Sequence, residues 1–207
     1  MTRRIYNAIR RGWLLPLYWT TLAYAELDSV RADVRQRMLL TGRQPRSSSP
    51  DEREILDAMR HPEFRSVLYT RMTPGAGRIA ARVLARIYRP QVALELNCVD
   101  IGPGLHVMHG FATIVNAQQI GADCMISQQV TIGHGGSVGG PSGTPTLGDR
   151  VSVLAGALVI GPIEIGDDCV IAAGAVVTRD MPAGSVVAGV PARPIGLAPA
   201  LRNQPHG

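Results

Sequence analysis

Two of the chain's five histidines, His106 and His109, stand three residues apart in the stretch GLHVMHGFATIV. An imidazole with a pKa of about 6.5 can accept a proton from a hydroxyl group near neutral pH. The two histidines differ in their surroundings: His106 falls inside a regular series of aliphatic residues, and His109 falls where that series is interrupted. Whether either does chemistry depends on the elements that position them.

Aliphatic residues recur every six positions in the second half of the chain, which fits neither the period of a strand nor that of a helix. The series comprises Ile101 and Val107; Ile114, Ile120, Ile126 and Ile132; then Leu147, Val153, Val159, Ile165, Ile171 and Val177. This interval predicts a parallel β-helix of hexapeptide repeats, in which each short strand buries one aliphatic side chain. Three strands form one triangular coil, and the coils stack. A Rossmann-type domain is not expected, because no strand–GxGxxG–helix unit occurs.

The series is broken twice. Val107 and Ile114 are seven residues apart, and Ile132 and Leu147 are fifteen apart. The second break holds the glycine-rich segment 133–146, which we expect to protrude as a loop. The first break falls at His109–Phe111. Function concentrates in segments that project from a rigid scaffold, so both breaks are candidate parts of a site.

The front of the chain has a helical pattern and a different charge. We predict a helical region over 1–90, a β-helix over 91–196 and a tail over 197–207. Ser49-Pro50 and the acidic residues after it predict a helix start, a break is expected near His61-Pro62, and Arg78–Tyr88 predicts a further helix. Near the N-terminus, Pro16 and the aromatic residues favour an amphipathic helix over a signal peptide.

Composition narrows the function classes. Residues 1–90 hold 17 Arg and 8 acidic residues (+9), and residues 91–207 hold 4 Arg and 8 acidic residues (−4). The arginines alternate with acids and form no basic-aromatic pattern, so we do not expect nucleic-acid binding. Cys98, Cys124 and Cys169 have the spacing of neither a zinc site nor a disulfide framework, which favours a reducing compartment. We expect a cytoplasmic protein without membrane contact, although the sequence leaves contact of the apolar N-terminus open.

The run IGPGLHVMHGFATIVNAQQIGADCMISQQVTIGHGG, followed by LGDRVSVLAGALVIGPIEIGDDCVIAAGAVVTRDMPAGSVVAGVPAR, resembles the serine acetyltransferase-like branch of the hexapeptide-repeat acyltransferases. The resemblance covers about residues 94–196. It implies an α+β fold with a helical front and a left-handed β-helix. It also implies homotrimers, paired in some members as a dimer of trimers, that bind acetyl-CoA as a co-substrate between subunits and hold no permanent cofactor.

The same resemblance assigns roles to particular residues. His109 matches the catalytic histidine that takes the proton from the acceptor hydroxyl. Glu95 takes the place of the aspartate that orients this histidine, if one residue is deleted after it. Ala155 and Ala173 match positions that line the coenzyme A arm, and Arg193 falls in a segment near its phosphates. No nucleophile–base pair is visible, so we expect direct transfer of the acetyl group.

The acceptor site departs from the family pattern. Serine-specific members carry an aspartate where Met108 stands, and an Arg-His-Pro triple where Gly143-Thr144-Pro145 stands. A free amino acid needs charged partners for its two charged groups. We therefore expect Met108, Thr144 and His134 to face the hydroxyl of a sugar or small metabolite, with L-serine as the alternative acceptor.

Two other classes remain open at this stage. Some β-helix proteins are carbonic anhydrases, and His106, His109 and His134 could supply a zinc site. That class carries an H-x4-H pair on one coil, which this chain lacks, so we expect no metal. A non-catalytic oligomeric scaffold is the other class, and a histidine at the position of His109 argues against it.

Overall fold

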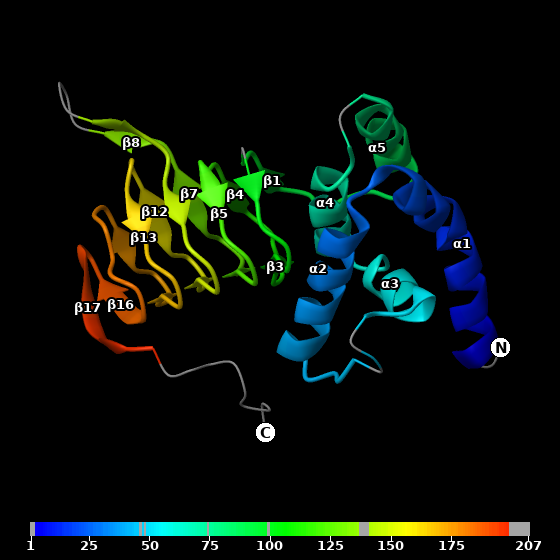
Figure 1. Ribbon diagram of the computed structural model, residues 1–207, viewed down its shortest axis with the longest axis horizontal. Helices are drawn as coiled ribbons and strands as arrows, with labels where there is room; N and C mark the ends of the chain where they lie inside the picture. The colour runs from blue at the N-terminus through cyan, green and yellow to red at the C-terminus, as the bar shows by residue number, and fades with distance from the viewer. Residues whose placement is uncertain are drawn as a thin grey trace. The chain divides into compact units, whose positions relative to one another are not determined.

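The computed structural model describes residues 3–45, 47, 49–73, 75–98, 100–136 and 141–198. Contacts divide the chain into two compact units, Met1–Gln91 and Val92–Gly207. The first unit is helical and the second is a parallel β-helix (Figure 1). Of the predicted tail 197–207, Leu197 and Ala198 are described, and the rest lies outside the described residues.

The helical unit begins with two long helices and continues with three shorter ones. They are α1 (Arg3–Tyr24), α2 (Leu27–Leu40), α3 (Glu52–Ala58), α4 (Pro62–Thr70) and α5 (Ala76–Ile87). Helix α3 starts with a capping box: the Asp51 carboxylate accepts from Glu54 N, and the Glu54 carboxylate accepts from Asp51 N, both at 2.9 Å. The predicted break is confirmed, because α3 ends before His61 and α4 starts at Pro62.

An apolar core and a buried ion pair hold these helices together. Leu17, Met59 and Leu68 are among its fully buried side chains. Asp33 of α2 and Arg71, which follows α4, are also buried. Arg71 Nε donates to Asp33 Oδ2 at 3.0 Å, and Arg71 Nη2 donates to Asp33 Oδ1 at 2.8 Å. The two-pronged geometry compensates a pair of charges that would otherwise be costly to bury.

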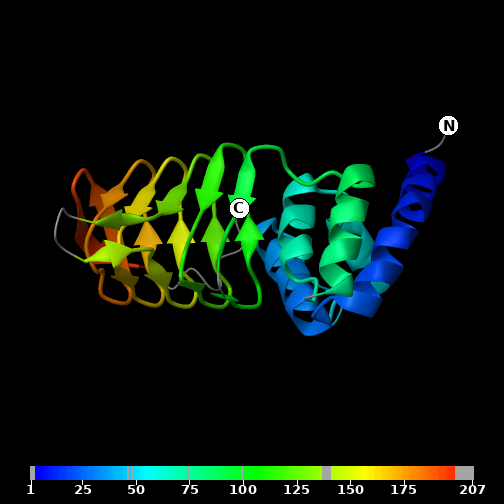
Figure 2. The same ribbon diagram turned by 90° about the horizontal axis from the view of Figure 1, so that it is seen from above.

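The β-helix consists of short strands that form three parallel sheets, which Figure 2 shows as stacked coils. The first sheet has β1 (Leu94–Leu96), β4 (Thr113–Val115), β7 (Thr131–Gly133), β12 (Leu158–Ile160) and β15 (Val176–Val177). The second has β2 (Asp100–Ile101), β5 (Gln119–Ile120), β10 (Thr146–Leu147) and β13 (Glu164–Ile165). The third has β3 (His106–Val107), β6 (Met125–Ile126), β11 (Ser152–Val153), β14 (Val170–Ile171), β16 (Ser185–Gly189) and β17 (Ala192–Leu197).

The predicted aliphatic series lines the interior with one exception. Parallel pairing stacks Ile132 on Val159 and Val159 on Val177, all fully buried. The assignment of Ile114 as an inward residue is wrong, because its side chain is 45% exposed and Val115 takes the inward place against Ile132. The positions of the inward residues along the sequence therefore shift by one residue just before β4. Each buried aliphatic side chain stabilises the unit by about 1.5–3 kcal/mol.

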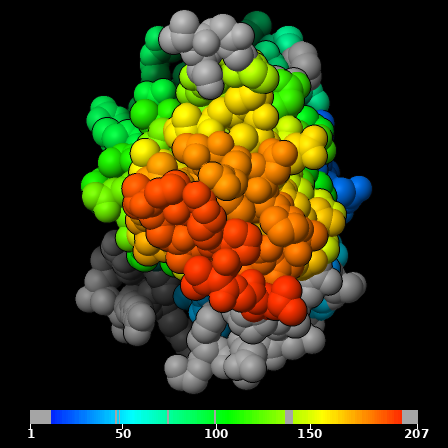
Figure 3. All heavy atoms as spheres, turned by 90° about the vertical axis from the view of Figure 1, so that its left-hand side faces the viewer, coloured from blue at the N-terminus to red at the C-terminus, as the bar shows by residue number. Residues whose placement is uncertain are grey.

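One corner of the β-helix is so tight that it accepts only glycine. A Cβ atom added to Gly121 would lie 2.4 Å from the backbone of Gly148 in the next coil. Gly102 meets the backbone of Gly121 in the same way, at 2.6 Å. At the C-terminal end, β16 and β17 pair antiparallel and cover the last coil, which faces the viewer in Figure 3.

The glycine-rich segment between β7 and β10 is described in part. Its two ends form a short antiparallel pair, β8 (Gly135–Gly136) with β9 (Ser142–Gly143). Residues 137–140 lie outside the described residues, so the predicted protrusion of 133–146 stays a prediction.

Candidate functional site

His109 lies in a two-residue insertion at a corner of the β-helix. The successive inward residues Val107 and Val115 are eight positions apart, whereas Ile126 and Ile132, which stack on them, are six apart. The surplus falls at His109–Gly110, where both residues have left-handed backbones, with φ of 61° and 31°. The imidazole is exposed. The insertion therefore moves the histidine off the regular path of the coil.

Backbone hydrogen bonds show which turns stand above one another at this corner. Gln129 N donates to Phe111 O at 3.0 Å, and Gly174 N donates to Ala155 O at 3.0 Å. Successive coils thus bond turn to turn along one edge, which we call the insertion edge. Its turns are Phe111–Ala112, Gln128–Gln129, Ala155–Gly156 and Ala173–Gly174. The structure places His109 at the start of the edge that also carries Ala155 and Ala173, the predicted coenzyme A positions.

Glu95 lies on the outer face of the sheet that starts at the insertion edge. Its Cα pairs with that of Ile114 in the next coil, and both side chains are exposed. Among the described residues, no hydrogen bond joins the Glu95 carboxylate to His109. The structure therefore brings Glu95 to the same region as His109 and leaves its orienting role a prediction.

Two of the predicted acceptor residues line one pocket. His134 and Thr144 border a hollow of about 350 Å³, at the base of the β8–β9 pair. His134 Nε2 and Ser142 Oγ are 3.0 Å apart, so the imidazole is held by the other strand of the pair. The pocket also has Gln118 and Glu164 in its wall, which the sequence did not single out. An acid and an amide here offer hydrogen-bond acceptors and donors to a polar ligand.

Met108 and Arg193 lie outside this pocket. Met108 is half-buried beside His109, and its N–H donates to Ile126 O at 2.8 Å. Arg193 is exposed in β17, paired with Ala188 of β16. Strand β17 contacts β15, which follows the Ala173–Gly174 turn. Arg193 therefore belongs to the same end of the β-helix as Ala173.

His106 is a buried scaffold residue, 4% exposed in β3. Among the described residues, no group of three or more His, Cys, Asp or Glu side chains is arranged to hold a metal ion.

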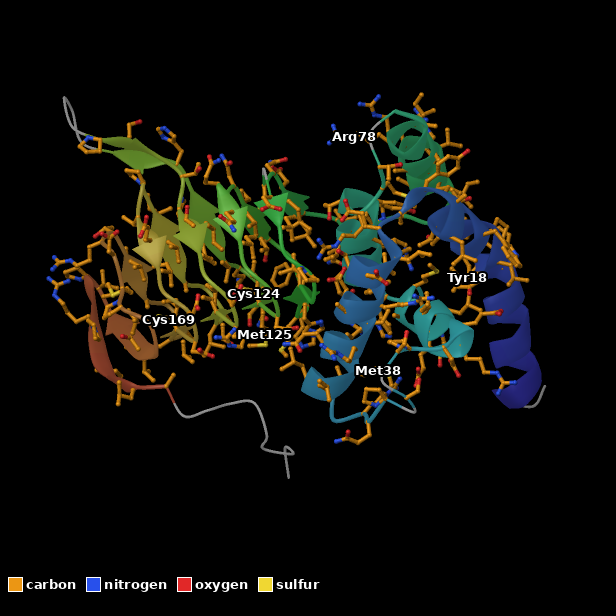
Figure 4. All side chains as sticks on the ribbon, viewed as in Figure 1. Tyr18, Met38, Arg78, Cys124, Met125 and Cys169 are labelled. Atoms are coloured by element: carbon orange, nitrogen blue, oxygen red, sulfur yellow. The ribbon has the colours of Figure 1, made fainter. Side chains whose placement is uncertain are left out.

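The cysteines are poorly suited to forming an acyl-enzyme. Burial raises the pKa of Cys124 to about 12 and also raises the pKa of Cys98 and Cys169. Figure 4 shows Cys124 and Cys169 within the coils. A nucleophilic cysteine needs a lowered pKa. Burial therefore disfavours a nucleophilic role for these three cysteines.

Comparisons with known proteins agree with the architecture. Residues 144–179 match the family described as bacterial transferase hexapeptide (six repeats). A serine acetyltransferase from Mycobacterium tuberculosis is 34% identical over 177 residues, which cover 82% of this chain and 73% of that protein. A serine acetyltransferase from Helicobacter pylori is 41% identical over 117 residues, covering 56% of this chain and 68% of that protein.

A solved structure is similar over most of the chain. The serine acetyltransferase from Neisseria gonorrhoeae, crystallised in complex with serine, matches with a TM-score of 0.59 and 25% identity. The match covers 81% of this chain and 68% of that one.

Proposed function

The chain belongs to the serine acetyltransferase branch of the hexapeptide-repeat acyltransferases and is an acyltransferase that uses acetyl-CoA; from this premise we propose that His109 is its general base. The observation that supports this role most is the insertion at His109–Gly110, which exposes the imidazole on the edge that carries Ala155 and Ala173. In the proposed reaction a ring nitrogen of His109 accepts the acceptor's hydroxyl proton, and the oxygen attacks the thioester carbonyl. The thiolate of coenzyme A leaves and takes the proton back from the imidazolium.

The arm of acetyl-CoA lies along the insertion edge in this proposal. The turns at Ala155 and Ala173 carry small side chains, which allow a ligand to approach the backbone closely. Arg193 stands at the same end of the β-helix as Ala173, and in this proposal its guanidinium would meet the phosphates. Glu95 would orient the imidazole through its second nitrogen once the substrates are bound.

The complete site requires more than one subunit. His109 lies on the corner where the chain passes from the third sheet to the first. The pocket with His134 and Thr144 lies where the chain passes from the first sheet to the second. One sheet thus separates the base from the pocket in a single chain. A trimer would set the pocket of one subunit beside His109 of its neighbour, which supports the predicted homotrimer.

L-serine is the acceptor that we propose first. Relatives that cover most of the chain are named serine acetyltransferases, and these names favour L-serine over the sugar or metabolite preferred from the sequence. A sugar hydroxyl stays a second candidate on one observation. Met108 and Thr144 are uncharged, and Glu164 in the pocket wall would repel the carboxylate of serine.

Substitution of His109 tests the proposed base. We expect His109→Ala to lower turnover with acetyl-CoA at least about 100-fold, the usual contribution of a general base. Arg53→Ala is the control, because Arg53 is exposed in α3 and lies outside the proposed site. Release of free coenzyme A measures activity, and light scattering measures the oligomer. Near-normal turnover by His109→Ala would refute the assignment.

An acceptor screen separates the two candidates. The intact protein is supplied with acetyl-CoA and either L-serine or a panel of sugars, and the acetylated product is identified by mass spectrometry. Saturable use of L-serine, with no comparable use of any sugar, is expected. Saturable use of a sugar without use of serine would refute serine and leave the role of His109 intact.

A further inference from the structure

Helix α5 exposes two parallel stripes of different chemistry. Its apolar stripe consists of Ile79, Val83 and Ile87, which are 62%, 53% and 55% exposed. Its basic stripe consists of Arg78, Arg82 and Arg86, all exposed. Each stripe has a spacing of four residues, so it follows one side of the helix. The opposite side, with Gly77, Ala81 and Tyr88, is buried. Figure 4 shows Arg78 pointing away from the unit.

Helix α1 continues this surface. The two helices are in contact: the rings of Trp13 and Tyr88 meet edge to face at 5.9 Å, and Tyr88 Oη donates to Trp13 O at 2.7 Å. Trp13 is 64% exposed, although indoles in soluble proteins are usually covered. We call the exposed stripes of α5 together with Trp13 the α1–α5 face.

The charge of this surface has one sign. Neither the sequence of α1 nor that of α5 contains an acidic residue. Among the described residues, no acidic side chain forms an ion pair with Arg78, Arg82 or Arg86. The basic groups of α5 are therefore available to an anionic partner.

From this arrangement we propose that the α1–α5 face binds reversibly to the surface of an anionic lipid bilayer. Aliphatic side chains would enter the boundary between headgroups and acyl chains, and the arginines beside them would contact lipid phosphates. The indole ring of Trp13 suits the headgroup level. No helix among the described residues is long and apolar enough to cross a membrane, so the contact is peripheral.

A second copy of the chain fits the face less well. A two-fold contact between α5 helices would bring each basic stripe close to its own copy, and like charges repel. A nucleic acid would match the arginines and leave the three aliphatic side chains of α5 without an apolar partner. A bilayer with anionic headgroups satisfies both stripes at once.

Vesicle binding by the full-length protein tests the proposal. We expect the protein to float with vesicles of phosphatidylcholine and phosphatidylglycerol at low salt, and not with vesicles of phosphatidylcholine alone. Arg78→Gln/Arg82→Gln should weaken binding about 25-fold, at roughly fivefold for each charge. Ile79→Ser/Val83→Ser should also weaken it. Ile195→Ser is the matched control, because Ile195 is 68% exposed in β17, outside the face, and should leave binding unchanged.

Several results would overturn the proposal. Absence of flotation with anionic vesicles would do so, as would equal flotation with neutral ones. Unchanged flotation of Ile79→Ser/Val83→Ser would exclude the face as the binding surface. If this variant instead lowers the mass of the oligomer by light scattering, and the unmodified protein ignores vesicles, the face is a contact between copies. Acetyl transfer in solution is measured separately, so the outcome does not depend on the role of His109.

Discussion

Deletion of His109–Gly110 should separate catalysis from folding. The deletion shortens the interval between the inward residues Val107 and Val115 from eight to the regular six. The backbone hydrogen bond from Gln129 N to Phe111 O can form as before, because both partners lie after the insertion. We therefore expect a folded oligomer with an unchanged β-sheet circular dichroism spectrum. Turnover with acetyl-CoA should fall at least about 100-fold, since the general base is gone.

A deletion of equal size in the next coil provides the control. Removal of Gln128–Gln129 shortens a regular interval of six, from Ile126 to Ile132, to four. Displacement of two or three inward aliphatic side chains would remove about 3–9 kcal/mol. That is comparable with the whole stability of a domain, about 5–15 kcal/mol. We expect this variant to be unfolded. If the two deletions destabilise the protein equally, or if the first retains full activity, the insertion argument is wrong.

Three further predictions concern stability. Gly121→Ala should lower the melting temperature, because its Cβ would stand 2.4 Å from the backbone of the next coil. Gly196→Ala is the control and should leave the melting temperature unchanged, because its Cβ would meet nothing within 4 Å. Equal melting temperatures for the two variants would contradict the tight corner. Arg71→Ala should cost about 3–5 kcal/mol in chemical denaturation, because it removes the guanidinium that pairs with the buried Asp33 carboxylate. A loss below 1 kcal/mol would count against this pair. Burial raises the pKa of Cys124 from 9.0 to about 12, so the thiol ionises at a lower pH in the unfolded chain than in the folded one, and stability should fall as pH rises above 9. In calorimetry, the stability of Cys124→Ala should fall less steeply with pH. An identical dependence of stability on pH in the two proteins would exclude this cause.

The architecture could be predicted because its physical cause repeats. Each coil buries the same kind of side chain at the same place, so an interval of six residues is visible without any knowledge of contacts. The exception is instructive. Ile114 and Val115 are both aliphatic and adjacent, and periodicity alone cannot choose between them once the phase has shifted. Only the pairing of Val115 with Ile132 decides which side chain points inward.

The site was predictable in its parts more than in its arrangement. The interruption at His109 is visible in the sequence. That His109 lies on the same edge as Ala155 follows from hydrogen bonds between coils, and these cannot be deduced from the intervals between residues in the sequence. Gln118 and Glu164 were missed because each stands beside a buried residue of its coil, Ala117 and Ile165 respectively, where a polar residue is ordinary. The pocket forms only where segments of different coils, around β5 and β13, come together in the folded chain.

Along the insertion edge, distances between residues of the proposed site are multiples of the spacing between coils. The turns at Phe111, Gln128, Ala155 and Ala173 lie on consecutive coils, and neighbouring strands are about 4.8 Å apart. His109 is therefore about 10 Å from the level of Ala155 and about 14 Å from that of Ala173 along the axis. Gain or loss of one complete coil between His109 and these turns would change their distance along the axis by about 4.8 Å, and every inward side chain would keep its register. The number of coils therefore sets the distance between the two ends of the proposed site, and a donor of another length could be accommodated by a change in that number while the pattern of core residues stays the same.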